Sequence, residues 1–298
     1  MRDLLVMGRQ AVNGTYYVHV GDLDWWLYYL PADDSPSWQN TYLWEDKENP
    51  GSLAAWSLLS PAWNSFDVFI SPAWHATSQV DEVYTWTEER LVQMVDQDNN
   101  GGIRTMWVAE HDDRLIARLS RHGFVASNQF MENMVRDLSS LQAITLPAGF
   151  NFRMVKGEMD LENRAAAQYA VFGSRLPFDK YCQRYLRFMR SPAYSHAMDL
   201  VIEAPGGQIV AFCILWPDVV TRVGLFEPVG VHPNFQKRGL GKALLADGLL
   251  RLRSAGMDSA IVDVECDNQP ALHLYRSVGF ITAERLITFT KPLMGDTP

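Results

Sequence analysis

The stretch that most constrains the fold is 224–245, GLFEPVGVHPNFQKRGLGKALL, which has the pattern of a strand, a tight turn and the first turns of a helix. Residues 225–231 are rich in apolar side chains, and Pro233 ends the expected strand because proline lacks a ladder donor. An apolar run with helical spacing follows from Leu240. The stretch therefore predicts an α/β unit in which a strand leads directly into a helix.

The glycines at this strand-to-helix junction would allow it to bind an anion. Gly239 and Gly241 let backbone N–H groups approach a ligand without a Cβ clash, and a helix N-terminus favours negative charge. Lys237, Arg238 and Lys242 add full positive charges. Basic residues oppose the helix dipole there, so a bound pyrophosphate would explain them. The alternative is a helix start with a basic first turn. The spacing fits neither a Rossmann fingerprint nor a Walker loop.

Two motifs carry a resemblance to a known family. Val231, Pro233, Gln236, Gly239 and Gly241 match Val-x-Pro-x-x-Gln-x-x-Gly-x-Gly, which resembles the acyl-CoA motif of the GNAT N-acyltransferase superfamily. Residues 268–280, NQPALHLYRSVGF, match a second motif of that superfamily, Asn-x-x-Ala-x-x-x-Tyr-x-x-x-Gly-Phe. The motifs stand in the family's order and together span about the last half of the chain.

The resemblance implies an α/β (α+β) chain of two tandem GNAT-like domains, each a mixed, mostly antiparallel sheet flanked by helices. It implies acetyl-CoA as co-substrate and no metal. The residues expected to contact acetyl-CoA are Val229, Gly230, Val231, Gln236, Lys237, Arg238, Gly239, Leu240, Gly241, Lys242 and Asn268.

The first half of the chain reads as a degenerate copy of the second. At an offset of 156 residues, Leu119 aligns with Tyr275 and Gly123 with Gly279, without a gap from Trp107/Asp263 to Phe130/Leu286. The eight residues directly after Pro72, AWHATSQV, contain neither Gly-x-Gly nor a Lys or Arg. We therefore expect it neither to bind CoA nor to supply a catalytic tyrosine. The arrangement is similar to two-copy members such as mycothiol synthase.

Hydrophobic periodicity and turn residues predict the order of elements. In the first half we expect a short strand within 1–20, a helix at 22–30, a loop at 31–36, strands at 41–45, 53–59 and 66–70, a helix at 80–97 stopped by 98–102, a strand at 103–108, a helix at 112–122 and a strand or strand pair at 124–134. In the second half we expect strands at 152–155, 199–203, 208–216, 221–231, 260–265 and 281–291, and helices at 160–172, 179–189, 240–254 and 268–277. We expect Asp160 to cap the first of those helices.

Charge divides the chain unequally. Residues 1–150 hold 9 Lys+Arg against 20 Asp+Glu, a net of −11, and residues 151–298 hold 17 against 15, a net of +2. An acidic chain disfavours nucleic acid as a ligand, and the acidic half mildly favours a cationic acceptor. A polar, Pro/Gly-terminated stretch predicts a linker at 139–150 between a degenerate domain, 1–138, and a catalytic domain, 151–298.

Hydrophobic residues make up 47% of the chain and charged residues 20%, a globular balance. No apolar run reaches the roughly 18 residues of a membrane span, and the first residues lack a signal-peptide core, so we expect a cytoplasmic protein without a membrane partner. Cys182, Cys213 and Cys266 lack CxxC spacing, which favours free thiols over a disulfide or metal ligands. Nine of the ten tryptophans lie in the first half, where they suit a core or an aromatic acceptor pocket.

Two residues are candidates for catalysis. Tyr275 occupies the position of the family's general acid toward the CoA sulfur; alternatively it is a packed helix aromatic. Glu227 is four residues before Val231, so on a regular strand both project to one face, and its apolar neighbours should raise its pKa. It is a candidate base, with Asp263 and Glu265 as alternatives; equally, it could pair with a cation such as Arg222.

Several polar residues near these two candidates can be assigned structural roles. Asn268 fits an N-cap as well as a contact to the pantetheine arm, and Asp267 is the alternative cap. His232 and His273 have no metal-ligand partner at a suitable spacing and read as surface residues. The sequence thus predicts an N-acetyltransferase acting on a small-molecule or peptide amine by direct attack, as a monomer or homodimer. The alternative is a CoA-binding regulatory or structural module without turnover.

Overall fold

The computed structural model describes residues 1–11, 14–30, 37–95 and 102–293. The expected loop at 31–36 and most of the expected helix stop at 98–102 lie outside these residues. All three cysteines are free thiols, and Cys213 is buried. Within the described part of the chain, no helix is both long enough and apolar enough to cross a membrane.

The first half begins with two helices that precede its strands. The N-terminal segment forms α1 (Arg2–Gln10), so the expected strand within 1–20 was wrong. Leu4, Leu5 and Gly8 are buried on one face of α1, a helical spacing, and Gly8 lies directly against the ring of Tyr17. The remaining elements follow the prediction within a few residues: α2 (Val20–Tyr28), β1 (Thr41–Glu45), β2 (Leu53–Ser60), β3 (Ser65–Ile70), α3 (Gln79–Met94), β4 (Ile103–Ala109), α4 (Asp113–Arg121) and β5 (Val125–Asp137).

The second half also follows the predicted order: β6 (Asn151–Met154), α5 (Leu161–Phe172), α6 (Phe178–Met189), β7 (Asp199–Glu203), β8 (Ile209–Asp218), β9 (Val223–Val231), α7 (Leu240–Ser254), β10 (Ser259–Glu265), α8 (Gln269–Ser277) and β11 (Ile281–Lys291). Asp160 stands at the start of α5, but its carboxylate accepts hydrogen bonds from Arg153 and the Lys156 N–H instead of capping the helix.

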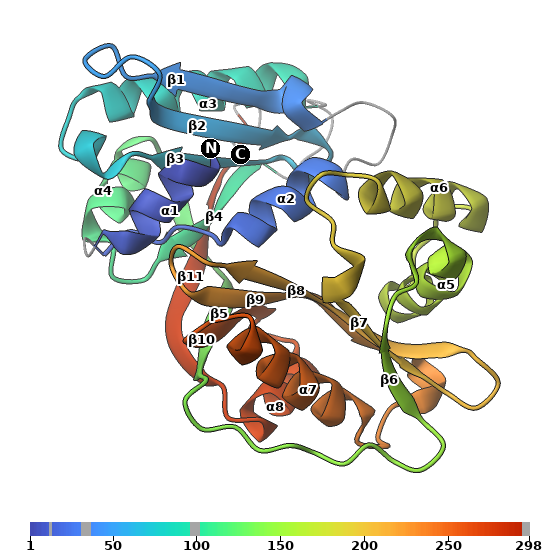
Figure 1. The fold of residues 1–298 in the computed structure, drawn as a ribbon. Helices are drawn as coiled ribbons and strands as arrows, with labels where there is room; N and C mark the ends of the chain where they lie inside the picture. The colour runs from blue at the N-terminus through green and yellow to red at the C-terminus, as the bar shows by residue number, and fades with distance from the viewer. Residues whose placement is uncertain (12–13, 31–36, 96–101, 294–298) are drawn as a thin grey trace.

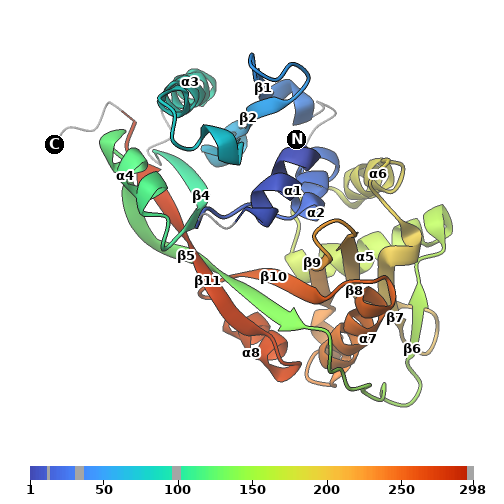
Figure 2. The same ribbon diagram turned by 60° about the vertical axis from the view of Figure 1, so that its left-hand side comes forward.

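One 11-stranded sheet joins the two halves, in the order β1-β2-β3-β4-β11-β5-β10-β9-β8-β7-β6. The last strand of each half lies in the other half's part of the sheet. β11 pairs with β4, and β5 pairs with β10, while β5 and β11 pair with each other. Figure 2 shows these two long strands side by side, running from one half to the other. The division into domains at 138 and 151 remains a prediction.

The offset seen in the sequence also relates the elements of the two halves. Moved by 156 residues, the bounds of β4 and α4 become those of β10 and α8, and β5 begins where β11 begins. Asp112 caps α4 through the Leu115 N–H as Asn268 caps α8 through the Ala271 N–H. The repeat in the sequence is therefore also a repeat of structure at these elements.

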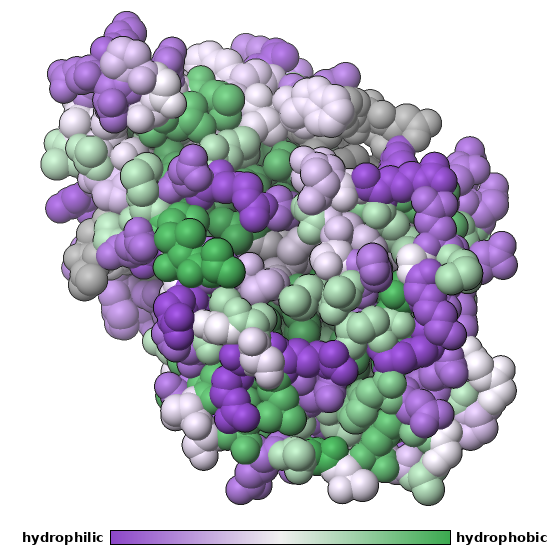
Figure 3. All heavy atoms as spheres, viewed as in Figure 1, coloured by the Kyte–Doolittle hydropathy of each residue, from purple (hydrophilic) through white to green (hydrophobic). Residues whose placement is uncertain are grey.

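Helices cover both faces of the second half's strands. Figure 1 shows α7 and α8 on one face and α5 and α6 on the other. The largest buried cluster lies between the strands and α7, and includes Leu215, Phe226, Leu244 and Leu249. Hydrophilic side chains are spread over both halves of the face in Figure 3, as expected for a chain with 20% charged residues.

Candidate active site

The strands β9 and β10 separate at the centre of the sheet. Their parallel pairing covers Val223–Leu225 against Ser259–Ile261. Beyond Leu225, β9 stays with β8 as far as Val231, and β10 stays with β5 as far as Glu265. A gap therefore opens between the two strands, bordered by backbone groups that lack a sheet partner on that side. The sequence alone could not show this separation.

The N–H groups of Val229 and Val231 face this gap. The next residue, His232, donates its backbone N–H to Val210 of β8. Because N–H directions alternate along a strand, the N–H groups of Val231 and Val229, one and three residues before His232, point away from β8. They are thus available to a ligand oxygen placed between the strands.

A bulge in β9 holds Glu227. The register shifts between Cys213 and Leu215 of β8, and Glu227 lies in the extra length of β9, where the Glu227–Pro228 peptide is cis. A bulge re-aims the side chains that it carries. Regular strand spacing, which would place Glu227 and Val231 on one face, therefore does not apply across the bulge. Trp216 fixes the bulge by donating its indole N–H to the Glu227 carbonyl oxygen at 2.6 Å.

The Glu227 carboxyl group has no partner among the described residues. Arg222, the cation suggested as its partner, binds Asp258 instead, through two hydrogen bonds of 2.5 and 2.7 Å. Burial, and next the nearby charge of Asp263, raise the pKa of Glu227 to about 7. A carboxyl with this pKa exchanges protons readily near neutral pH.

Two further carboxyl groups stand close to Glu227. Asp263 of β10 accepts hydrogen bonds from the Asn133 amide at 2.8 Å and the Tyr16 hydroxyl at 3.1 Å, yet burial still raises its pKa to about 6. Asp22 of α2 has its pKa raised by burial and then by Asp263 and Glu227. Three acidic groups from three elements thus meet beside the gap.

His19 fixes the helix that carries Asp22. Its ring accepts from the Gly21 N–H and contacts the Val223 carbonyl oxygen at 3.1 Å, and the Asp22 carboxylate caps the His19 N–H. Burial and then Arg9 lower the pKa of His19 to about 3, so the ring is neutral. The sequence does not indicate His19, Asp22, Tyr16 or Asn133, because they lie far from Glu227 along the chain and no motif marks them.

Tyr275 lies on α8, facing the same groups. Its side chain is buried, with its ring 5.6 Å from that of Phe280. Burial, followed by the charges of Glu227, Cys213 and Asp263, raises its pKa well above the usual value, so the hydroxyl keeps its proton. Asn268 caps α8, accepting from the Ala271 N–H at 3.2 Å, which confirms the capping role and excludes Asp267 from it.

The junction between β9 and α7 forms an open backbone cradle. Gly239 begins α7 with φ 79°, and a Cβ placed on it would meet nothing within 4 Å. Lys237, Arg238 and Lys242 are exposed around it, and the Gln236 amide ties the loop to the Val231 carbonyl oxygen at 3.2 Å. An anionic group can therefore reach the first N–H groups of α7. These features fit the pyrophosphate of CoA.

Other residues expected at the cradle have packing roles. A Cβ on Gly241 would lie 3.1 Å from Leu274 of α8, and one on Gly230 would lie 2.4 Å from the ring of Phe212. Leu240 is buried, and Val229 and Val231 pack against the main core cluster. His273 is exposed, as predicted. His232, also predicted to lie at the surface, is half-buried, and its ring caps a short turn by accepting from the Asn234 N–H.

The comparisons with known proteins agree with this geometry. Residues 160–280 match the Acetyltransferase (GNAT) family. Residues 160–280 form a GNAT domain. Mycothiol acetyltransferase from Streptomyces bingchenggensis is 31% identical over 47% of this chain and 45% of its own length. Mycothiol acetyltransferase from Kineococcus radiotolerans is 30% identical over 62% of both chains. The matched part thus spans less than two thirds of either relative.

A solved structure extends the likeness over the whole fold. A tandem GNAT protein from the clavulanic acid biosynthesis pathway superposes with a TM-score of 0.70 at 12% identity, covering 99% of this chain and 94% of that one. Such low identity shows the fold alone. It confirms the predicted fold class, and the present sheet adds that the two GNAT-like halves share their strands.

The first half lacks the parts that make the GNAT domain's site. Where α7 follows an open glycine cradle, α3 follows the short turn Pro72–Trp74, with no Gly-x-Gly. Leu119 stands where the GNAT domain has Tyr275, and it is fully buried in the first half's own core. The described part of the first half therefore has no counterpart of this cradle or of Tyr275.

Proposed function

We propose that this chain is an N-acetyltransferase that moves an acetyl group from acetyl-CoA to a primary amine, with the catalytic groups in its C-terminal half. The observation that carries the proposal is the gap between β9 and β10. It brings an unpaired carboxyl with a pKa of about 7, a protonated tyrosine and free N–H groups beside an open glycine cradle.

Each group has one role in this proposal. The first turn of α7, with Lys237, Arg238 and Lys242, holds the pyrophosphate of acetyl-CoA, which supplies an acetyl thioester. Glu227 accepts the proton of the amine, directly or through a water. The N–H groups of Val229 and Val231 donate to the thioester oxygen as negative charge develops on it. The Tyr275 hydroxyl gives its proton to the departing sulfur.

The acceptor is a small molecule with an ammonium group. The relatives are named for mycothiol, which agrees with a small-molecule acceptor. Asp22, Asp263 and Glu227 surround the place where the amine must arrive, and close carboxylates favour a cation. Because α2 and Tyr16 belong to the first half, that half shapes the acceptor side of the site.

Release of free thiol from acetyl-CoA across a panel of primary amines tests the proposal. We expect amine-dependent release with at least one member, together with the N-acetylated product by mass spectrometry. Release that never exceeds the rate without amine, although acetyl-CoA binds, would instead favour a CoA-binding module without turnover. A panel of alcohols of matched size is the control.

A further inference from the structure

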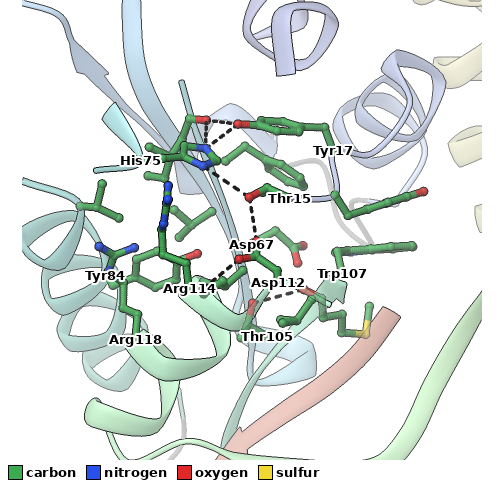
Figure 4. Close-up of a pocket in the computed structure, with 18 residues that line it drawn as sticks. Thr15, Tyr17, Asp67, His75, Tyr84, Thr105, Trp107, Asp112, Arg114 and Arg118 are labelled. Atoms are coloured by element: carbon green, nitrogen blue, oxygen red, sulfur yellow. Dashed lines mark hydrogen bonds between the residues drawn. The ribbon is translucent and has the colours of Figure 1, made fainter. Parts of the chain in front are cut away.

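A second gap lies in the first half, at the place that corresponds to the candidate active site. The strands β3 and β4 pair in parallel at Ser65 and Arg104, and they diverge beyond that pair. A cavity of about 40 Å³ fills the space between them. Figure 4 shows it, with Thr15 and Tyr17 on one side and Tyr84 and Arg118 on the other.

Asp67 of β3 lines this cavity without a hydrogen-bond partner among the described residues. Its side chain is almost wholly buried, with the residue 8% exposed, and its Oδ1 atom is completely enclosed. Burial raises its pKa to about 7, against the opposing effect of Arg104. A buried carboxyl without a donor is costly, so this position calls for a ligand that donates hydrogen bonds.

Several of the other polar groups around the cavity are already engaged with partners. The Asp112 carboxylate accepts from the Thr15 hydroxyl at 2.7 Å and caps α4. Burial lowers the pKa of His75, whose ring contacts the Tyr17 hydroxyl at 2.6 Å, so the ring is neutral. Two arginines, Arg114 and Arg118, also line the cavity, and Arg118 is held by Asp81 at 2.7 Å.

Aromatic rings complete the wall. Tyr16 stacks on Trp107, with ring centroids 6.3 Å apart and an interplanar angle of 14°, and Tyr84 lines the opposite side with α3. Carboxylates together with ring faces are the combination that recognises an ammonium ion.

We propose that this cavity is a second ligand site, which binds the ammonium group of a small primary alkylamine against Asp67. A water molecule needs roughly 10–15 Å³ of such space, so the cavity holds an ammonium group with one or two carbons attached. Ethylammonium is therefore the probe. The site is separate from the candidate active site, although Tyr16 lines it and also donates to Asp263.

Thermal unfolding of the full chain, titrated with ethylammonium chloride at constant ionic strength, tests the proposal. We expect a saturable rise in Tm, absent with ethanol. Asp67→Asn removes the negative charge and keeps the shape, so its apparent affinity should fall at least about tenfold. If Asp67→Asn does not fold, Asp67→Ser replaces it in the same titration. Glu82→Gln, an exposed neighbour outside the cavity, is the charge-matched control and should bind like the parent.

The candidate active site could also attract an amine, so Glu227→Gln is measured in parallel. Retention of the saturable rise in Glu227→Gln and its loss in both Asp67 variants support the proposal. It is overturned if the parent shows no saturable rise, if Asp67→Asn and Asp67→Ser bind as tightly as the parent, or if Glu227→Gln abolishes the rise.

Discussion

At the scale of single residues, the unpaired carboxyl of Glu227 decides the chemistry. If it accepts the amine proton, kcat/KM should rise with pH through about 7, where this carboxyl ionises. Glu227→Gln should lower turnover by roughly 10²–10⁴-fold and remove that acidic limb. The control is Glu265→Gln, which removes an exposed carboxylate at the end of β10. It should leave both the turnover and the acidic limb unchanged. An unchanged limb at full turnover would exclude Glu227 as the base.

Glu227→Gln should also change how the stability of the protein depends on pH. The pKa of Glu227 is raised from 4.5 to about 7 in the fold, so folding disfavours its ionised form. The stability that the protonated carboxyl provides is present below pH 4.5 and is lost as the pH rises toward 7. Glutamine does not ionise, so the Tm of Glu227→Gln relative to the parent should increase between pH 5 and pH 8. A relative decrease would indicate that Glu227 is paired with a cation.

Tyr275 offers a second test at this scale. Tyr275→Phe removes the hydroxyl and keeps the ring that packs on Phe280. As the acid toward the sulfur, its loss should reduce turnover roughly 10- to 10⁴-fold while the affinity for acetyl-CoA stays the same. Steady-state kinetics and a binding titration check this together. Unchanged turnover would assign Tyr275 to packing alone.

At the scale of elements, the two glycines of the cradle should behave differently. Gly239→Val places a side chain in the open space before α7 and should abolish acetyl-CoA binding with a Tm loss of only a few degrees, from its positive φ. Gly241→Val pushes against Leu274 and should lower the Tm much more. Calorimetry and thermal unfolding separate the two effects. Equal Tm losses would contradict this division of roles.

The order of the elements could be predicted because local patterns encode it. Leu240–Ser254 and Ile281–Lys291 were predicted with the bounds observed, since Gly239 and Gly279 mark the junctions before them. α1 was missed because a short helix with two adjacent leucines also suits a strand. The sequence could not show that β5 and β11 each lie in the other half's part of the sheet. The two strands have similar patterns, so either could pair with either half.

The candidate site could be predicted in part for the same reason. The cradle and Tyr275 lie in contiguous motifs, so the sequence indicated them. Asp22 comes near Glu227, and Tyr16 reaches Asp263, only through the packing of the first half against the second, which no local pattern encodes. The bulge at Glu227 depends on the register with β8, which the order of residues does not specify.

At the scale of the whole molecule, the shared strands make the halves depend on each other. Residues 1–138 alone would leave β5 without β10, and residues 151–298 alone would leave β11 without β4. Each half expressed separately should therefore be unstable or aggregate through its open strand edges. Co-expression of the two halves should restore a soluble complex, which size-exclusion chromatography detects. Two halves that are monomeric and cooperatively folded on their own would contradict this.

We propose that acetyl-CoA binds at the cradle of the second half and nowhere else in the chain. Calorimetric titration of the full chain with acetyl-CoA measures this, with Gly239→Val as the matched variant. We expect about one acetyl-CoA per chain and no binding to Gly239→Val at the same concentrations. A stoichiometry of two, or binding that survives in Gly239→Val, would contradict it.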